Sequence, residues 1–326
     1  MCSRTAFAIF SLSLILLGAN RVHAAVLDVT SIVGSQIDQV DTSLNTVSTF
    51  YNTPSAADSI MFDPSGDVIY TQLFNGQVRL YNPNTTADTL IASGFNGPAD
   101  IVLEPGGNSM LVSEFNGGKV DRINLTTHAV TPLLTSSTQG PEGLAYDGTR
   151  LFANLGVRST GAAKYVAEIN PITGAILSQS PLISSLDGLV YDPYSGRLIA
   201  TSVYNNAVYS IDPNNLNSVI DLTALLRGKI PGPDGVTVDG LGKIFIASSD
   251  GTPAGGGYGL GDGHIYEIDE VNNTLTQDLY VNGLDDLAPL SGPGSLQVPE
   301  PASLTLAALG LVGLLISRRL LHWSQR

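Results

Sequence analysis

Acidic residues recur at one position of a segment that is repeated along the chain. These residues are Asp58, Glu142, Asp187, Asp234 and Asp285, while Ala99 occupies the same position in the remaining repeat. Each lies two residues before the first apolar residue of a short expected strand. Ca²⁺ takes about six to eight oxygen ligands, mostly carboxylates and carbonyls. If the repeats converge, the column predicts a site for Ca²⁺ or another divalent cation.

Loops that follow the second strand of several repeats carry further polar side chains. Asn75, Asn116, Asn205 and Asp250 are expected on the same face as the acidic column, as possible ligand-binding groups. Arg158, in the loop 155–163, is a candidate for an anionic substrate. The alternative is structural, because an Asp before a strand can accept backbone N–H bonds in the entry turn. Like charges around one axis argue against it, since they raise pKa values or require a counterion.

Catalytic chemistry has few candidate groups. A metal ion that polarises a lactone would need a base for water, and Glu142 or Asp187 could serve. His128 and His264 are the only histidines between residues 25 and 292, so a Ser/His/Asp triad is not expected. Cys2 is the single cysteine, which excludes thiolate catalysis from the folded part. The Gly-rich loop 249–263 matches no phosphate-binding pattern, so no organic cofactor is expected.

The elements that carry the acidic column repeat five times. The repeats start at residues 59, 100, 143, 188 and 235, so their spacings are 41, 43, 45 and 47 residues. Each contains a short inner strand, a second apolar strand such as 197–202, an alternating third strand such as 207–212, and a fourth such as 129–134. Four strands in roughly 45 residues are typical of a propeller blade.

The remaining segments complete a sixth blade. Residues 286–290 match an inner strand with nothing after it, while 25–29, 36–41 and 46–51 match the other three strands. The sequence therefore predicts an all-β fold, a six-bladed β-propeller over residues 25–292 whose last blade is closed by both termini. Five blades plus an N-terminal hairpin is the alternative.

One motif carries a family resemblance. Gly232-Pro233-Asp234-Gly235-Val236, followed by a strand at 243–247, resembles NHL-repeat and senescence-marker-protein/gluconolactonase propellers. Gly140-Pro141-Glu142-Gly143 and Asp187-Gly188 repeat it. The gluconolactonase resemblance implies a divalent metal bound at this position in a few blades, first by Asp234 and next by Glu142 and Asp187.

The composition excludes one class of partner. The chain has 326 residues, with 15 Lys plus Arg against 29 Asp plus Glu. Five of the basic residues lie in the two ends, so residues 25–300 hold 29 acidic and 10 basic residues, a balance of 10 − 29 = −19. Nucleic-acid binding depends on clustered basic side chains, so no nucleic-acid partner is expected.

The two ends of the chain are typical of targeting segments. Residues 1–24 resemble a secretory signal for signal peptidase, with a mature chain beginning at Ala25. Residues 293–326 form a linker and a short apolar anchor at 304–316. The motif residues Pro299, Glu300, Pro301, Arg318 and Arg319 resemble a PEP-CTERM sorting signal. That resemblance implies insertion of the C-terminal helix in the inner membrane before processing by exosortase, in a Gram-negative bacterium that makes an exopolysaccharide matrix.

Two functions follow from these features. The first is an exported, exosortase-sorted binding protein of the cell surface or extracellular matrix, with a glycan, peptide or small molecule at the propeller mouth. The alternative is a divalent-metal-dependent lactonase or hydrolase of the gluconolactonase type.

Overall fold

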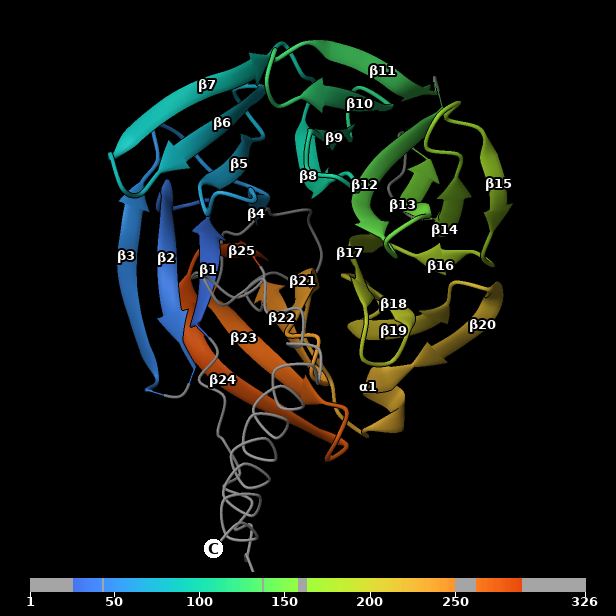
Figure 1. The fold of residues 1–326 in the computed structure, drawn as a ribbon. Coiled ribbons are helices and arrows are strands. Elements are labelled where there is room, and N and C mark those ends of the chain that lie inside the picture. Colours follow the sequence, from blue (N-terminus) through green and yellow to red (C-terminus); the bar gives the residue numbers. More distant parts are fainter. Residues whose placement is uncertain (1–25, 43, 137, 158–162, 250–261, 289–326) are drawn as a thin grey trace, which may run out of the picture.

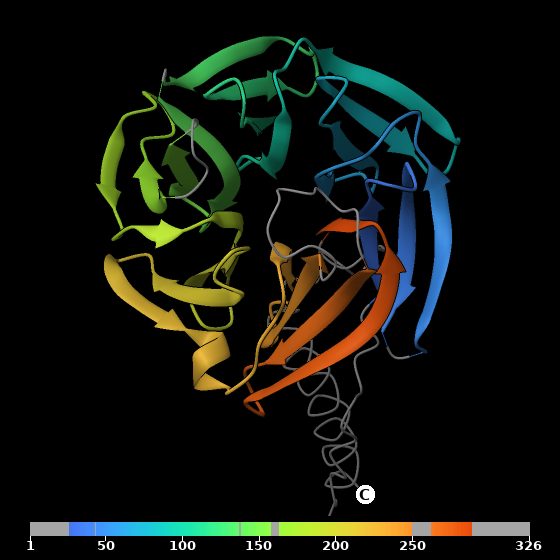
Figure 2. The ribbon, with the colours of Figure 1, turned by 180° about the vertical axis from the view of Figure 1, so that it is seen from behind.

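Six antiparallel sheets surround one central axis, as the two opposite views in Figures 1 and 2 show. The computed structural model describes residues 26–288 except 43, 137, 158–162 and 250–261. The six-bladed fold is confirmed, and the alternative with five blades and a hairpin is wrong. The N-terminal strands form a sheet with the last described strand instead of a separate hairpin.

Each blade runs from an innermost first strand to an outermost fourth strand. Blade 1 contains β4 (Ile60–Phe62), β5 (Val68–Gln72), β6 (Gln77–Asn82) and β7 (Ala87–Ser93). Blade 2 contains β8 (Pro98–Leu103), β9 (Ser109–Glu114), β10 (Lys119–Asn124) and β11 (Val130–Thr135). Blade 3 contains β12 (Gln139–Tyr146), β13 (Leu151–Val157), β14 (Ala163–Ile169) and β15 (Ile176–Gln179), and β16 (Ile183–Ser184) also pairs with β14.

The other three blades follow the same order. Blade 4 contains β17 (Leu186–Asp192), β18 (Arg197–Ser202), β19 (Ala207–Asp212) and β20 (Asn215–Asp221), followed by the short helix α1 (Leu222–Leu225). Blade 5 contains β21 (Pro233–Val238), β22 (Lys243–Ser249), β23 (Asp262–Asp269) and β24 (Thr274–Asn282). Blade 6 contains β25 (Leu284–Leu287), β1 (Val26–Ser31), β2 (Gln36–Asp41) and β3 (Thr46–Asn52).

The burial of a strand follows its place in the blade. The second strand β5 is buried along its whole length, whereas the outer strand β15 is exposed along its whole length. A second strand has neighbouring blades on both faces, so its sequence is almost continuously apolar. The hydrophobic clusters accordingly join adjacent blades, as where Leu27 and Val29 of blade 6 pack with Phe245 and Val281 of blade 5.

Blade 6 closes the circle with strands from both ends of the chain. In β25 and β1, Leu287 pairs with Val29 and Leu284 with Ser31. The N–H of Ala288 donates to the carbonyl of Asp28 over 2.8 Å. The two ends of the propeller therefore lie side by side in one sheet.

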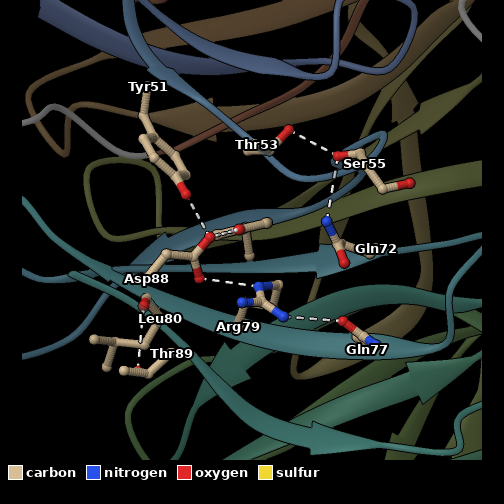
Figure 3. A network of polar contacts seen from close by, with 10 residues as sticks. Tyr51, Thr53, Ser55, Gln72, Gln77, Arg79, Leu80, Asp88 and Thr89 are labelled. Atoms are coloured by element: carbon tan, nitrogen blue, oxygen red, sulfur yellow. Dashed lines mark hydrogen bonds and ion pairs between the residues drawn. The ribbon is translucent and has the colours of Figure 1, made fainter. Parts of the chain in front are cut away.

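A polar network fixes blade 6 against blade 1 (Figure 3). Tyr51 of β3 and Tyr70 of β5 both donate to Oδ2 of Asp88, and Arg79 Nε donates to Oδ1 over 2.9 Å. The ring of Tyr51 also stacks on Tyr81 with centroids 3.8 Å apart. Burial, with help from Asp88, raises the pKa of Tyr51 to about 12, so the hydroxyl remains a donor at neutral pH. This network anchors the outermost strand of blade 6, which also contains the strand pair from the two ends of the propeller, to blade 1.

Candidate functional site

A belt of short polar side chains sets the position of the innermost strands. Its members, one near the end of the second strand in five of the blades, are Thr30, Thr71, Ser113, Asn154 and Thr201. Thr30 Oγ1 accepts from the N–H of Asp286 in its own blade over 2.9 Å and donates to the carbonyl of Asp58 in the next blade over 2.5 Å. Thr201 likewise joins Gly188 to Asp234. Each such bond holds the starts of two neighbouring inner strands in register.

The five predicted carboxyl groups converge on one central cavity of about 1010 Å³. Asp58, Glu142, Asp187, Asp234 and Asp285 all line it. The sequence predicted this convergence from the column alone. It missed two further carboxyl groups at the starts of the inner strands, Asp100 and Asp286, and the cavity is also lined by Asp28 of β1 and Asp63 of the turn after β4. We call the five predicted residues together with Asp100 and Asp286 the carboxyl ring.

Asp100 and Asp286 lie one residue beyond the predicted column, at a position where three blades have glycine. A Cβ atom at Gly143 would lie 2.5 Å from the carbonyl oxygen of Asp187. A Cβ atom at Gly235 would lie 2.2 Å from Oδ1 of Asp286. In blades 3 to 5 the backbone at this position therefore packs directly against the next blade. In blades 6, 1 and 2 the same position carries a polar side chain, namely Asp286, Ser59 and Asp100.

Asp100 ties three blades together. Its Oδ1 accepts from Ser59 Oγ of blade 1 over 2.9 Å and from the N–H of Ile101 over 2.7 Å. Its Oδ2 accepts from the N–H of Leu144 in blade 3 over 2.6 Å. Burial raises the pKa of Asp100 to about 6, although these three donors favour the ionised form.

Burial raises the pKa values of the six aspartic acids of the ring, and repulsion between carboxyls adds to this at several of them. The pKa of Asp58 lies well above its ordinary value, first through burial and then through Asp285. The pKa of Asp234 is raised by burial and then by Asp187 and Asp285. The side chains of Asp58 and Asp234 reach the cavity and are half-buried. The ring therefore either retains protons at neutral pH or takes up positive charge.

One cation lies beside the ring and pairs with one of its members, and the sequence did not reveal it. Lys164 of β14 is 3% exposed and forms an ion pair with Oε2 of Glu142. Its Nζ also lies 5.5 Å from the centre of the Phe115 ring. Burial lowers the pKa of Lys164, while Asp187 and Asp234 act in the opposite direction. Glu142 is thus balanced from within the protein.

The predicted asparagines lie elsewhere on the propeller. Asn75, Asn116 and Asn205 are exposed on the turns between second and third strands, and none of them lines the cavity. These turns are on the face where the inner strands start, as the pairing of Pro98 with Glu114 shows. The cavity extends instead toward the opposite face, where the turn 63–66 and residues 83 and 84 line it. Asp250 and Arg158 lie outside the described residues.

No group of three or more His, Cys, Asp and Glu side chains suited to a metal ion was found within the described residues. The seven ring carboxyls nevertheless share one cavity, and Asp285 raises the pKa values of both Asp58 and Asp234. His128 is exposed in the turn between β10 and β11, and His264 lies on β23 beside Tyr280. Neither histidine lines the cavity.

Comparisons with known proteins support the fold and the sorting signal. Residues 297–319 match the PEP-CTERM protein-sorting motif, and this match contains Pro299, Glu300, Pro301, Arg318 and Arg319. A chain in the crystal structure of a nidogen/laminin complex is similar in fold, with a TM-score of 0.65. At 13% identity, over 81% of this chain and 97% of that one, the similarity shows the fold alone. A search of curated proteins found no match.

These comparisons leave the finer family resemblance as a prediction. None of them names an NHL or gluconolactonase-like protein, or a cofactor. The proposed signal peptide and the apolar segment 304–316 lie outside the described residues, and no helix within the described part is long and apolar enough to cross a membrane. The chain is a six-bladed β-propeller that carries a PEP-CTERM sorting motif, which implies export to the cell envelope or beyond.

Proposed function

We propose that this chain is an exported binding protein that takes a positively charged ligand into its central cavity. The observation that carries the proposal is the carboxyl ring itself. The seven ring carboxyls, together with Asp28 and Asp63, line a cavity of about 1010 Å³, and no Lys, Arg or His is among the described residues that line it. The ligand would be a small molecule, glycan or peptide that bears a cationic group.

The electrostatics of the ring favour a cation. Two unit charges about 4 Å apart repel by roughly 4 kcal/mol at an effective dielectric constant of ~20. The raised pKa values of Asp58, Asp234 and Asp286 have burial as their main cause, followed by repulsion from other ring carboxyls. A bound cation would offset both the cost of burying these carboxylates and the repulsion between them. The charge alone would therefore contribute to the binding free energy, whatever other contacts the ligand makes.

The cavity wall indicates that the cation carries apolar surface. Beyond the ring, the inner strands present Ile60, Leu144, Leu189, Val236 and Leu287 to the cavity. Ligand sites in proteins commonly combine apolar walls with a few converging polar groups. An organic cation would place its charge at the ring and its apolar part against these strands.

The proposal is tested by calorimetry and thermal unfolding with alkylammonium ions. We expect binding to the wild-type chain at pH 8, with a rise in Tm, and a loss of affinity of at least about tenfold in Asp234→Asn and Asp58→Asn. Glu168→Gln is the matched control, because Glu168 lies on β14 away from the cavity and bonds to Ser178. Equal affinity of Asp234→Asn and Glu168→Gln for the cation would contradict the proposal.

The cellular setting is part of the proposal. We infer that signal peptidase removes residues 1–24 and that exosortase acts at the PEP-CTERM tail, in a Gram-negative bacterium with an exopolysaccharide matrix. The sorting motif at 297–319 supports this setting. Mass spectrometry of the exported protein should give Ala25 as its first residue, and an N-terminus elsewhere would contradict the assignment of the signal.

A divalent-metal-dependent lactonase of the gluconolactonase type is the second candidate. Its support is the convergence of Asp58, Asp234 and Asp285 on one cavity, because their oxygens suit Ca²⁺ or another hard cation. Because Glu142 is paired with Lys164, Asp187 is the better candidate for a base that activates water. Turnover of sugar lactones with Ca²⁺, Mg²⁺, Mn²⁺ or Zn²⁺, abolished in Asp234→Ala, would favour this function over simple binding.

A further inference from the structure

Lys164 divides the carboxyl ring into two unlike halves. Its stem passes over Gly156, where a Cβ atom would lie 2.3 Å from Cγ of Lys164. Its Nζ reaches Glu142 and lies over the ring of Phe115. Lys164 does not line the cavity, so it holds this half of the ring from outside.

The opposite half of the ring, in blades 6 and 1, has no such cation among the residues described. Asp285 is 5% exposed and lines the cavity. Its neighbour is Asp58, whose carboxyl shares a hydrogen bond with it. Asp286 lies beside both, next to Ser59. Two adjacent carboxyls that share a hydrogen bond need a proton or a cation between them.

The half held by Lys164 shows which cation suits this ring. An ammonium group is a compact charge with three donors and no acceptor, and Glu142 already binds one. The site at Asp58 and Asp285 offers carboxylate acceptors of the same kind. Ile60 and Leu287 follow these carboxyls on their strands and line the cavity, so an alkyl chain attached to the ammonium would lie on apolar surface.

We propose that Lys164 is a specificity-determining residue: by pairing with Glu142 from outside the cavity, it removes one of two positions at which the ring could hold an ammonium group. The wild-type channel then binds its ligand through a single primary ammonium group, held by Asp58, Asp285 and Asp286. This inference rests on the proposed function and narrows the ligand class to alkylammonium compounds. It assigns Lys164 the task of excluding a second positive charge.

The test compares a monoamine with a diamine of equal length. Hexylamine and 1,6-diaminohexane are titrated into the full chain at pH 8, where both are charged. The wild type should bind the two within about threefold of each other. Lys164→Met keeps the length of the side chain but removes its charge, so its affinity for the diamine should exceed that for the monoamine by roughly tenfold or more.

A double variant supplies the matched control. Lys164→Met with Glu142→Gln removes both partners of the ion pair, and it should return the ratio of the two affinities to that of the wild type. Lys164→Met leaves Glu142 buried without a partner, which lowers stability. Thermal unfolding can still test a destabilised variant, because it measures stabilisation by the ligand. We expect 1,6-diaminohexane to raise the Tm of Lys164→Met more than hexylamine does.

The outcomes separate this inference from the proposed function. If Lys164→Met binds or is stabilised by both amines equally, the role of Lys164 is wrong, while hexylamine binding to the wild type still supports a cation-binding channel. If the wild type binds neither amine, the proposed function itself is overturned. Asp285→Asn should weaken hexylamine binding about tenfold, and an unchanged affinity would place the ammonium elsewhere.

Discussion

Replacing Asp121 should change how the stability of the propeller depends on pH. Asp121 of β10 is 5% exposed, and burial together with a hydrogen bond to Glu114 raises its pKa from 3.8 to about 7. The folded protein therefore holds a proton here that the unfolded chain releases near pH 4. The free energy of unfolding must then fall as the pH rises from about 4 to about 7, and level off above that.

The size of the effect follows from the same values. A change in pKa from 3.8 to about 7 corresponds to roughly 4 kcal/mol between the two protonation states, at about 1.4 kcal/mol per tenfold. Asp121 and Glu114 border a cavity of about 320 Å³, and the exposed cation Lys119 lies 3.5 Å from Glu114. Water and this cation reduce the penalty, so we expect about 2 kcal/mol.

Thermal unfolding of Asp121→Asn across pH 4 to 9 measures this effect. The variant should match the wild type at pH 4 and exceed its stability by about 2 kcal/mol at pH 8, because a neutral amide does not repel Glu114. Glu168→Gln, on a half-buried acid bonded to Ser178, is the control and should parallel the wild type. If the stability of Asp121→Asn changes with pH in the same way as that of the wild type, Asp121 and Glu114 do not share a proton.

Three further substitutions test other parts of the fold. Asp88→Ala should lower the free energy of unfolding, measured by urea titration, by about 3 kcal/mol, because Tyr51 and Arg79 lose their partner. Tyr51→Phe should lower it by only about 1 kcal/mol, and equal losses in the two variants would contradict this explanation. Gly188→Ala should reduce Tm by several degrees, since its Cβ would lie 2.6 Å from the carbonyl oxygen of Asp234, and an unchanged Tm would show that blades 4 and 5 are loosely packed there. Thr201→Val should lower the free energy of unfolding by about 2 kcal/mol, and Thr201→Ser should lower it by less than about 1 kcal/mol, as measured by urea unfolding. Similar losses in the two variants would show that the hydroxyl group is not what stabilises this contact.

The sequence predicted the blades and the acidic column because both repeat with the fold. The inner strand returns every 41 to 47 residues, so equivalent positions must meet around the axis. The remaining ring members break this rule. Asp100 stands one position beyond Ala99, and Asp286 one position beyond Asp285, so alignment on the column passed over them.

Lys164 could not be found from its own surroundings in the sequence. It belongs to the third strand of blade 3, where an alternating strand tolerates a lysine without any role. It reaches Glu142 only because residue 156 is a glycine on the neighbouring strand β13. The polar belt was missed for a different reason, since Thr and Ser are common in strands and only the hydrogen bonds to the next blade distinguish Thr30 or Thr201.

The closure of blade 6 gives the propeller a mechanical weak point. The sorting tail continues directly from β25, a strand of four residues that pairs with β1 at two positions. Tension on a tethered tail would load this strand before any other and peel it from the sheet. Because β25 carries Asp285 and Asp286, the first event under force would remove two of the seven ring carboxyls, so tension on the tail would dismantle the proposed cation site first.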